Sequence, residues 1–523
     1  MASAPIFLNL LEKHDKLIDK TTKKSEQKSI QKSDYIPPTG HISILKSGVS
    51  DEDGTKTCHL IFHNGVNWKH GRSWDFAEDW FCLDIAWSSS FINTENLKHV
   101  QAFHVTSKSP GASMENCSTS FGFVLAAAVD LSDHDSDSFC VLLFGGQSTE
   151  TALTSNRLEI VTGPNDFDGT LDCKAYRAGP RVYNEYKLPS DYSGEPVQTG
   201  IVPSSRCGHS LGKLSSDLLV CIGGLSIPKA DKHKFHPSDS NLFLLRYPEI
   251  EWIKIEKISE LDRTEHSMYI FEEKIYIVGG YSFRNHLASE IFPYNQVLEI
   301  KINRSEENTF YTSQNIISLD IMPDYGEPFL TSMSSVGVSG CLYLYGGYTW
   351  PAYDPVKQNM YALCPPYTSH NKRPKQESIL VEINLVELDI KLLRAPTEFA
   401  TAGGSLQVLS RNEDGKLENL LIVGGSAQRL DLYSTFSFEL KKCDLNPEYG
   451  GCIVTLSTRE KDFLSCSSSD CTKVVHIMCD KYTRGLAKMT NAKYLCPMCA
   501  NYDPVTKKKR PKPNARRGVR RGT

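Results

Sequence analysis

Eight side chains that could bind metal lie near the C-terminus, in the order of four cysteines, one histidine and three cysteines. They are Cys443, Cys452, Cys466, Cys471, His476, Cys479, Cys496 and Cys499. Thiolates and imidazoles in sets of four, paired at short spacings, are the ligands of tetrahedral structural zinc. Eight ligands therefore predict two structural Zn²⁺ ions. A segment of this size has too small a core to fold alone, so we expect the metals to supply most of its stability.

The first ligand pair has unusual spacing. Cys466 and Cys471, His476 and Cys479, and Cys496 and Cys499 are closely spaced, whereas eight residues separate Cys443 from Cys452. Cys443 also follows directly on the last expected strand of the preceding domain. It is therefore either a zinc ligand, which is the interpretation we adopt, or the end of that strand.

Five short apolar segments upstream each end in a pair of glycines. They are residues 141–146, 220–224, 275–280, 342–347 and 421–425. An apolar, β-branched and aromatic run stopped by glycine is typical of a buried strand that enters a turn with positive φ. The recurrence of this segment along the chain, with several strands in each repeat, indicates the blades of a β-propeller with long loops.

A second expected strand follows each glycine pair, as in Leu242–Leu245 and Val297–Ile300. An earlier strand–turn–strand segment, residues 60–65 and 80–85, adds a sixth copy in which the glycine pair is lost. We therefore predict a mainly β protein with six blades. His209 and His266 precede two of the pairs in the same phase, and this repetition favours packing or hydrogen bonding over catalysis.

The composition, 40% hydrophobic and 23% charged, is that of a folded protein with one large domain and smaller additions. No run of 18 apolar residues is present, so we expect no membrane insertion. The segment Phe7–Leu11 has no basic region before it, so we expect no secretion signal. The nine cysteines that precede Cys443 are scattered singly and are interpreted as thiols of a reducing compartment.

The last residues form a basic segment. Residues 501–523 contain nine Lys and Arg residues and only Asp503, a net charge of +8, so the rest of the chain carries −12 of the total of −4. The nine are Lys507, Lys508, Lys509, Arg510, Lys512, Arg516, Arg517, Arg520 and Arg521. A segregated basic tail rich in Pro and Gly is expected to be disordered and suits nuclear import or phosphate binding that weakens as salt rises.

The glycine-pair units resemble the kelch repeat, and the Cys/His order resembles the plant homeodomain (PHD) finger. By that resemblance one zinc takes Cys443, Cys452, His476 and Cys479, and the other takes Cys466, Cys471, Cys496 and Cys499. Such fingers often bind methylated lysine of histone H3 in an aromatic cage, through cation–π attraction. Phe463 and Tyr449 match or could reach cage positions, but Val474 stands where the family usually has tryptophan. We therefore expect weak or methylation-insensitive histone binding.

The full organisation is a flexible lead-in (1–39), a six-bladed kelch-like propeller (40–441), a zinc-bound PHD-type finger (443–500) and a disordered basic tail (501–523). This combination resembles the family of accessory subunits of the V(D)J recombinase and related transposases. Local similarity is strongest at Cys207–Ser210, at Tyr276–Tyr281 and at Phe62–Gly65 with Trp68. The long acidic hinge and the cage tryptophan of the vertebrate members are missing, which suggests a divergent member.

The resemblance implies a nuclear, non-catalytic subunit that binds and activates a catalytic recombinase or transposase subunit and contacts DNA or chromatin. Two alternatives stay open: an independent chromatin reader or scaffold, and a kelch-type ubiquitin-ligase adaptor. The adaptor would need a BTB or F-box module, and the first 40 residues are too short and polar for one. A copper oxidase would need a ligand set that the sequence does not provide.

We expect two zinc ions per chain, both held within residues 443–499. Cys496→Ser should remove zinc and unfold the finger while the cooperative melting of the propeller persists, because the two cores are separate. Elemental analysis and calorimetry of the purified chain measure both effects. One zinc per chain, unchanged by Cys443→Ser, would assign Cys443 to the preceding strand.

Overall fold

The protein is mainly β in all the parts that the computed structural model describes. These are residues 7–9, 42–47, 55–63, 66–69, 73–76, 80–87, 97–105, 107–108, 123–124, 126–132, 138–148, 154–164, 171–178, 196–226, 236–237, 241–284, 287–305, 309–320, 330–349, 375–394, 400–411, 417–425, 429–434, 463–465, 467 and 474–476. Within these ranges the one helical element is a 3-10 turn, η5 (Ser259–Leu261). Among them there is also no helix with the length and apolar character needed to cross a bilayer.

The strands form six antiparallel four-stranded units, numbered here in chain order. Units 1 and 2 are β2 (Ile42–Ser47), β3 (Lys56–His63), β6 (Trp80–Trp87) and β7 (Leu97–Val105), then β10 (Ala127–Asp130), β11 (Ser138–Phe144), β13 (Leu158–Pro164) and β14 (Leu171–Ala178). Units 3 and 4 are β16 (Ser210–Lys213), β17 (Leu218–Ile222), β20 (Asn241–Arg246) and β21 (Glu251–Lys257), then β22 (Ser267–Phe271), β23 (Lys274–Val278), β26 (Gln296–Arg304) and β27 (Phe310–Ser318). Units 5 and 6 are β29 (Ser334–Val338), β30 (Cys341–Tyr345), β33 (Ile379–Asn384) and β34 (Asp389–Arg394), then β35 (Gly404–Arg411), β36 (Leu417–Gly424), β37 (Arg429–Ser434) and β1 (Phe7–Asn9).

Shorter strands occupy the connections around these units. They are β4 (Val66–Lys69) with β5 (Ser73–Phe76), β9 (Phe123–Val124) with β12 (Gln147–Ser148), β18 (Leu225–Ser226) with β19 (His236–Pro237), β24 (Tyr281–Arg284) with β25 (Leu287–Ile291), and β28 (Leu330–Thr331) with β31 (Tyr348–Thr349) and β32 (Lys375–Gln376). Most of them lie between the second and third strands of a unit.

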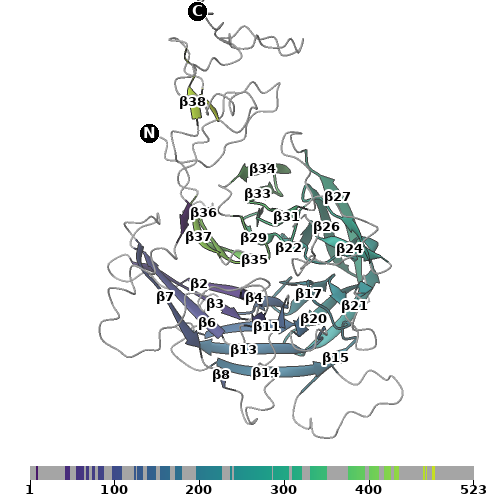
Figure 1. Ribbon diagram of the computed structural model, residues 1–523. Coiled ribbons are helices and arrows are strands. Elements are labelled where there is room, and N and C mark those ends of the chain that lie inside the picture. The colour runs from purple at the N-terminus through teal and green to yellow at the C-terminus, as the bar shows by residue number, and fades with distance from the viewer. Residues whose placement is uncertain are drawn as a thin grey trace, which may run out of the picture.

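The first strands of the units close a ring. β2 contacts β10, β10 contacts β16, and the cycle continues through β22, β29 and β35 back to β2. Figure 1 shows the units arranged around this ring. The last unit takes its fourth strand from the other end of the chain, because Phe7, Leu8 and Asn9 pair with Tyr433, Leu432 and Asp431. The expected flexible lead-in therefore contains a strand, which the last unit needs because β37 would otherwise be its edge.

The prediction of six blades is wrong: the propeller-like arrangement contains five large hydrogen-bonded sheets. A short strand, β15 (Val197–Gly200), pairs in parallel with both β14 and β21 and joins units 2 and 3 into one sheet of ten strands. The tenth strand, β8 (Ser107–Lys108), pairs with β14. The four residues of β15 show no hydrophobic pattern, so the sequence does not predict this link between units 2 and 3.

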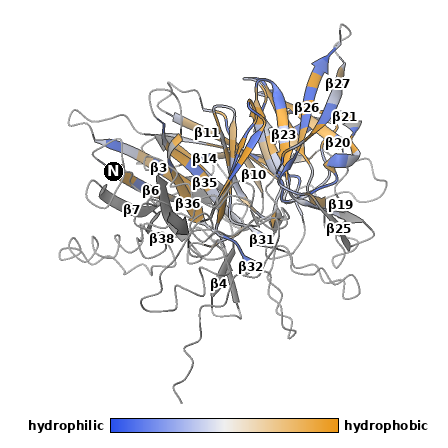
Figure 2. Ribbon diagram, turned by 90° about the horizontal axis from the view of Figure 1, so that it is seen from above, coloured by the Kyte–Doolittle hydropathy of each residue, from blue (hydrophilic) through white to orange (hydrophobic). Residues whose placement is uncertain are grey.

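The core lies between consecutive units, as expected for a repeat whose faces are both covered. Leu142 and Phe144 of unit 2 pack with Leu219 and Phe243 of unit 3, and comparable clusters join units 3 to 4, 4 to 5 and 5 to 6. Figure 2 shows the apolar residues concentrated in the strands of these units. This packing explains why the second strand of each unit is a continuous apolar run.

One buried side-chain amide, that of Gln198, stabilises the fused sheet. Gln198 is 2% exposed. Its Nε2 donates to the carbonyls of Asn156 (2.9 Å) and Tyr176 (3.0 Å), and its Oε1 accepts from Nε1 of Trp252 at 2.7 Å. One side chain therefore links units 2 and 3 through three hydrogen bonds.

We expect Gln198→Leu to lower the free energy of unfolding by about 2 to 3 kcal/mol, because it leaves buried polar partners without a hydrogen bond. Thr199→Val is the matched control: the exposed neighbour donates to the carbonyl of Ile250 at 3.2 Å, and its loss should cost under about 1 kcal/mol. Urea unfolding followed by tryptophan fluorescence compares them. Equal losses would show that β15 is not held by Gln198.

Candidate functional site

The predicted zinc ligands lie outside the described residues, with the exception of His476. The structure shows a hairpin of β38 (Phe463–Ser465) and β39 (Val474–His476), in which Phe463 is opposite His476 and Ser465 is opposite Val474. The proposed cage residues Phe463 and Val474 therefore lie on adjacent strands. Tyr449 and all nine basic tail residues lie outside the described part of the chain. Within the described ranges, no group of three His, Cys, Asp or Glu side chains is placed to hold a metal ion.

The Arg-x-x-His-Ser sequence occurs twice, at residues 206–210 and 263–267. Both segments lie between units, where they have the packing and hydrogen-bonding role expected of their histidines. Nη1 of Arg206 donates to the carbonyl of Gly223 at 2.9 Å, and Nη1 of Arg263 donates to that of Gly279 at 3.3 Å. Each arginine therefore holds the glycine turn of its own unit. The guanidinium of Arg263 also lies 3.6 Å from the ring centre of Phe292, a favourable cation–π distance.

His209 and His266 fill the space beside the glycine turn of the preceding unit. A Cβ at Gly145 would lie 2.7 Å from Cε1 of His209, and one at Gly223 would lie 2.7 Å from Cε1 of His266. Burial lowers the pKa of His209 well below its usual range and that of His266 to about 3, and the adjacent arginines act in the same direction. Both rings are therefore neutral packing elements at physiological pH.

Glu265 is a partly buried acid in this seam that sequence reasoning missed. It adopts a left-handed conformation (φ 52°), as the equivalent Gly208 does (φ 63°). Its carboxyl group accepts hydrogen bonds from the hydroxyls of Tyr281, at 2.6 Å, and Ser332 of the next unit. Burial raises its pKa. The sequence could have indicated this residue, because Glu265 stands at a repeat position where unit 3 has Gly208. The side chain of Glu265 links units 4 and 5.

The turn between β33 and β34 is a feature of the described surface that is suited to binding a partner. Val386 is 67% exposed and Leu388 is 53% exposed. Leu388 also has a φ of 55°, a conformation that costs a leucine on the order of 1 kcal/mol or more. A residue that is both strained and exposed without local compensation is a candidate for function.

Unit 3 provides a comparison, because its turn between β20 and β21 has the same length and ends in a residue with the same left-handed φ. Ile250 occupies the position of Leu388 and has a φ of 56°. Ile250, however, is only 2% exposed and packs in the core with Trp252. Burial offsets the strain in unit 3, whereas unit 5 has no such compensation within the described chain.

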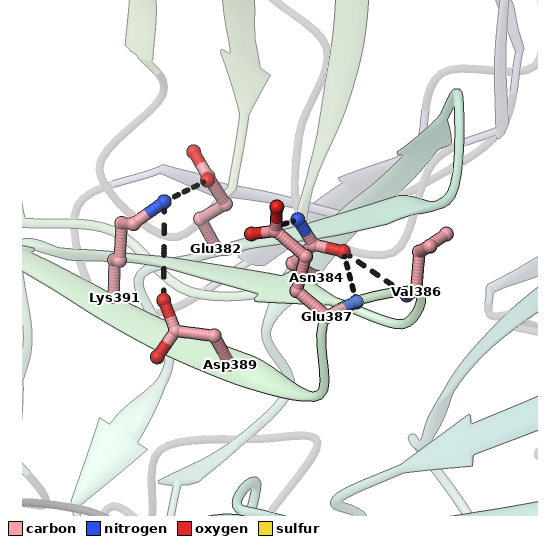
Figure 3. A network of polar contacts seen from close by, with 6 residues as sticks. All are labelled: Glu382, Asn384, Val386, Glu387, Asp389 and Lys391. Atoms are coloured by element: carbon pink, nitrogen blue, oxygen red, sulfur yellow. Dashed lines mark hydrogen bonds and ion pairs between the residues drawn. The ribbon is translucent and has the colours of Figure 1, made fainter.

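The unit 5 turn is ordered before any partner binds. Oδ1 of Asn384 accepts hydrogen bonds from the backbone N–H groups of Val386 (3.0 Å) and Glu387 (2.9 Å), and its Nδ2 donates to the Glu387 carboxylate at 3.1 Å. Figure 3 shows this network beside Lys391, which bridges Glu382 and Asp389. A preformed turn loses little conformational entropy on binding.

The surroundings of this turn are acidic. The turn between β22 and β23 lies alongside, because a Cβ at Gly340 would meet both Val386 (2.9 Å) and Phe271 (3.1 Å). That turn adds exposed Glu272 and Glu273. Two nearby lysines are paired with carboxylates, Lys274 with Glu299 at 3.0 Å and Lys391 with Glu382 at 3.2 Å, and Lys301 lies opposite Lys274 on β26. The surface formed by these turns, here called the acidic turn surface, thus offers an aliphatic centre beside four exposed carboxylates, Glu272, Glu273, Glu387 and Asp389.

No protein-family model matches the chain, and no curated protein matches it in sequence. Among solved structures, the chain is similar to a chain in the cryo-EM structure of RAG in complex with one melted RSS and one unmelted RSS. That match has a TM-score of 0.44 and 12% identity and covers 77% of this chain and 96% of the other. A second similar structure, that of YjhT, has a TM-score of 0.41 and 12% identity over 76% of this chain and 93% of the other. At this level neither neighbour's function transfers to this chain.

The buried histidines predict acid sensitivity. The unfolded chain binds protons on these residues below about pH 6.5, but the folded chain binds them only near the lowered pKa, so stability falls as the pH drops from about 6.5 toward 3. His266→Gln should reduce this slope by up to about 1.4 kcal/mol per pH unit between pH 6 and pH 4. Urea unfolding at several pH values measures the slope.

The control for this experiment is Gln198→Leu, which destabilises the fold without removing a titrating group. It should lower stability equally at every pH and leave the slope unchanged. An unchanged slope in His266→Gln as well would mean that His266 takes up its proton in the folded state.

Proposed function

We propose that this chain is a non-catalytic accessory subunit of a DNA recombinase or transposase. Its kelch-like propeller binds and activates the catalytic subunit, and its PHD-type finger and basic tail contact chromatin or DNA in the nucleus. The single observation that carries the binding role is the acidic turn surface, where a strained leucine stays exposed although its counterpart Ile250 is buried.

The charge of this surface favours a particular kind of partner. Enzymes that act on DNA carry Lys and Arg to neutralise phosphates, and such surfaces complement Glu272, Glu273, Glu387 and Asp389. Complementary charge accelerates association and excludes acidic competitors. The aliphatic side chains of Val386 and Leu388 then supply the apolar contact that stabilises the complex.

The finger and tail supply the nucleic-acid side of the proposal. Two structural zinc ions would order residues 443–499 through the eight Cys and His ligands, and the +8 segment at residues 501–523 would bind phosphates without sequence preference. Loss of the cage tryptophan at Val474 favours weak histone H3 contact. The propeller body carries net negative charge, which favours protein over DNA as its direct partner.

A non-enzymatic role agrees with the state of the buried polar groups. His209 and His266 are held neutral in the seams, and the Glu265 carboxylate is engaged by Tyr281 and Ser332. These groups serve inter-unit contacts. The alternatives, a chromatin scaffold or a ubiquitin-ligase adaptor, differ in the partner that they predict.

The experiment begins with the stoichiometric partner that co-purifies from nuclei. We expect a transposase-like protein, and we expect the purified chain alone to cut no DNA in Mg²⁺ or Mn²⁺ while raising strand transfer by that partner. Val386→Asp with Leu388→Asn should weaken binding by about ten-fold or more, because the apolar contact is lost and negative charge is added. Surface plasmon resonance and strand-transfer assays give the two readouts.

Ile201→Asn is the matched control, since Ile201 is 60% exposed but follows β15 between units 2 and 3 and is not part of the acidic turn surface. It should bind as the unmodified chain does. Leu388→Asn should keep or raise the melting temperature, because asparagine tolerates positive φ better than leucine. Cleavage by the chain freed of all partners, or a cullin as the stoichiometric partner, would overturn the accessory role.

A further inference from the structure

The outermost strand of unit 4, β27, is an exposed sheet edge of unusual composition. Its nine residues pair with β26 without interruption, from Phe310 opposite Arg304 to Ser318 opposite Gln296. On its other side it pairs with no described strand. Tyr311 is 52% exposed and Ile316 is 56% exposed. An open edge of this length is a template for pairing with another chain.

The outer edges of the other units are protected. β1 pairs with three residues of β37 in unit 6. In units 2 and 3, β15 and β8 pair with the ends of β14 and β15 pairs with the start of β21, and both edge strands contain charged residues such as Lys174 and Lys254. In unit 5, β34 contains Asp389, Lys391 and Arg394, and in unit 1, β7 contains Lys98 and a register shift. Charges, bulges and covering strands are the devices that natural sheets use against unwanted pairing. By contrast, β27, with the sequence FYTSQNIIS, has no charge, no proline and no bulge.

The β26–β27 hairpin also projects from its unit. β23 pairs with β26 only from Val297 to Lys301, so the part of the hairpin near Arg304 and Phe310 extends beyond β23. Figure 2 shows β27 at the periphery of the molecule, extending past its neighbours. A strand placed there can be approached edge-on by a body as large as a second propeller.

We propose that β27 pairs antiparallel with β27 of a second copy of this chain, across a two-fold axis at Gln314. A two-fold perpendicular to a sheet keeps each side chain on its own face, so paired residue numbers must have the same parity. Centred on Gln314, Tyr311 faces Ile317 of the second copy and Phe310 faces Ser318. All nine residues pair, and the aromatic and β-branched residues meet in favourable cross-strand pairs.

The absence of charge favours a second copy over a different protein. Two identical strands that carried lysine or glutamate near the axis would repel each other, whereas β27 places no charge opposite its own copy. An edge selected for a distinct partner would gain specificity from complementary charges, as at the acidic turn surface. A two-fold contact of this kind also closes at two copies instead of growing into a filament.

Sedimentation velocity of the full chain at increasing concentration tests the proposal. We expect a monomer–dimer equilibrium. Gln314→Lys should raise the dimer dissociation constant by about five-fold or more, because two like charges then face each other at the axis. Gln314→Thr, which keeps the strand neutral, should dimerise as the unmodified chain does, and all variants should melt at similar temperatures because Gln314 is exposed.

A charge-swap mixture fixes the register. Gln314→Glu alone should also weaken dimerisation, and an equimolar mixture of Gln314→Lys with Gln314→Glu should recover the dimer, since lysine then faces glutamate. A monomer at every concentration, or a dimer that none of these variants alters, overturns the proposal. If the chain is monomeric and Gln314→Lys instead weakens binding of its co-purifying partner, β27 pairs with that partner and self-pairing is wrong. The proposed accessory role is tested separately, by the Val386 and Leu388 variants.

Discussion

The contact on which the ring depends is a backbone hydrogen bond that crosses from one unit to the next at the glycine turns. The N–H of Gly146 donates to the carbonyl of Arg206 at 2.8 Å, Gly224 to Arg263 at 2.9 Å and Gly347 to Thr401 at 2.9 Å. A Cβ on the first glycine of a pair would collide with the same carbonyl, at 2.4 Å for Gly223. The glycine pairs therefore do more than turn the chain, because they allow two units to approach closely enough for their apolar faces to be buried.

This contact also explains how far the sequence could be interpreted. The glycine pairs, the apolar strands before them and the mainly β propeller arrangement were predictable and are confirmed, because each unit repeats the same local chemistry. The closing strand Phe7–Asn9 and the bridge Val197–Gly200 were not, because a short strand is defined by a partner distant in sequence. For the same reason no local sequence pattern indicates the fusion of two units into one sheet, which overturned the prediction of six blades. The finger and tail remain predictions.

In a repeat protein, a residue shared by several units is explained by the fold, and one that departs from the repeat needs another explanation. His209 and His266 recur, and both are buried packing groups. Ile250 and Leu388 share a turn position and a strained φ, but only Ile250 is buried. Sequence reasoning missed Leu388 because both turns contain aliphatic residues. Only the three-dimensional comparison shows that one of them has no core to enter.

The charge distribution is the physical basis on which the proposed function gives different partners to different parts of the chain. The +8 segment at residues 501–523 contrasts with −12 on the rest, so the attraction for nucleic acid is concentrated in the tail. Near the acidic turn surface Lys274 pairs with Glu299 and Lys391 pairs with Glu382, and the Glu382 carboxylate raises the pKa of Lys391. What remains exposed is repulsive toward DNA and attractive toward a basic protein. Under the proposed function, the propeller would therefore hold a DNA-binding partner without competing for the DNA, and the tail would add phosphate contacts.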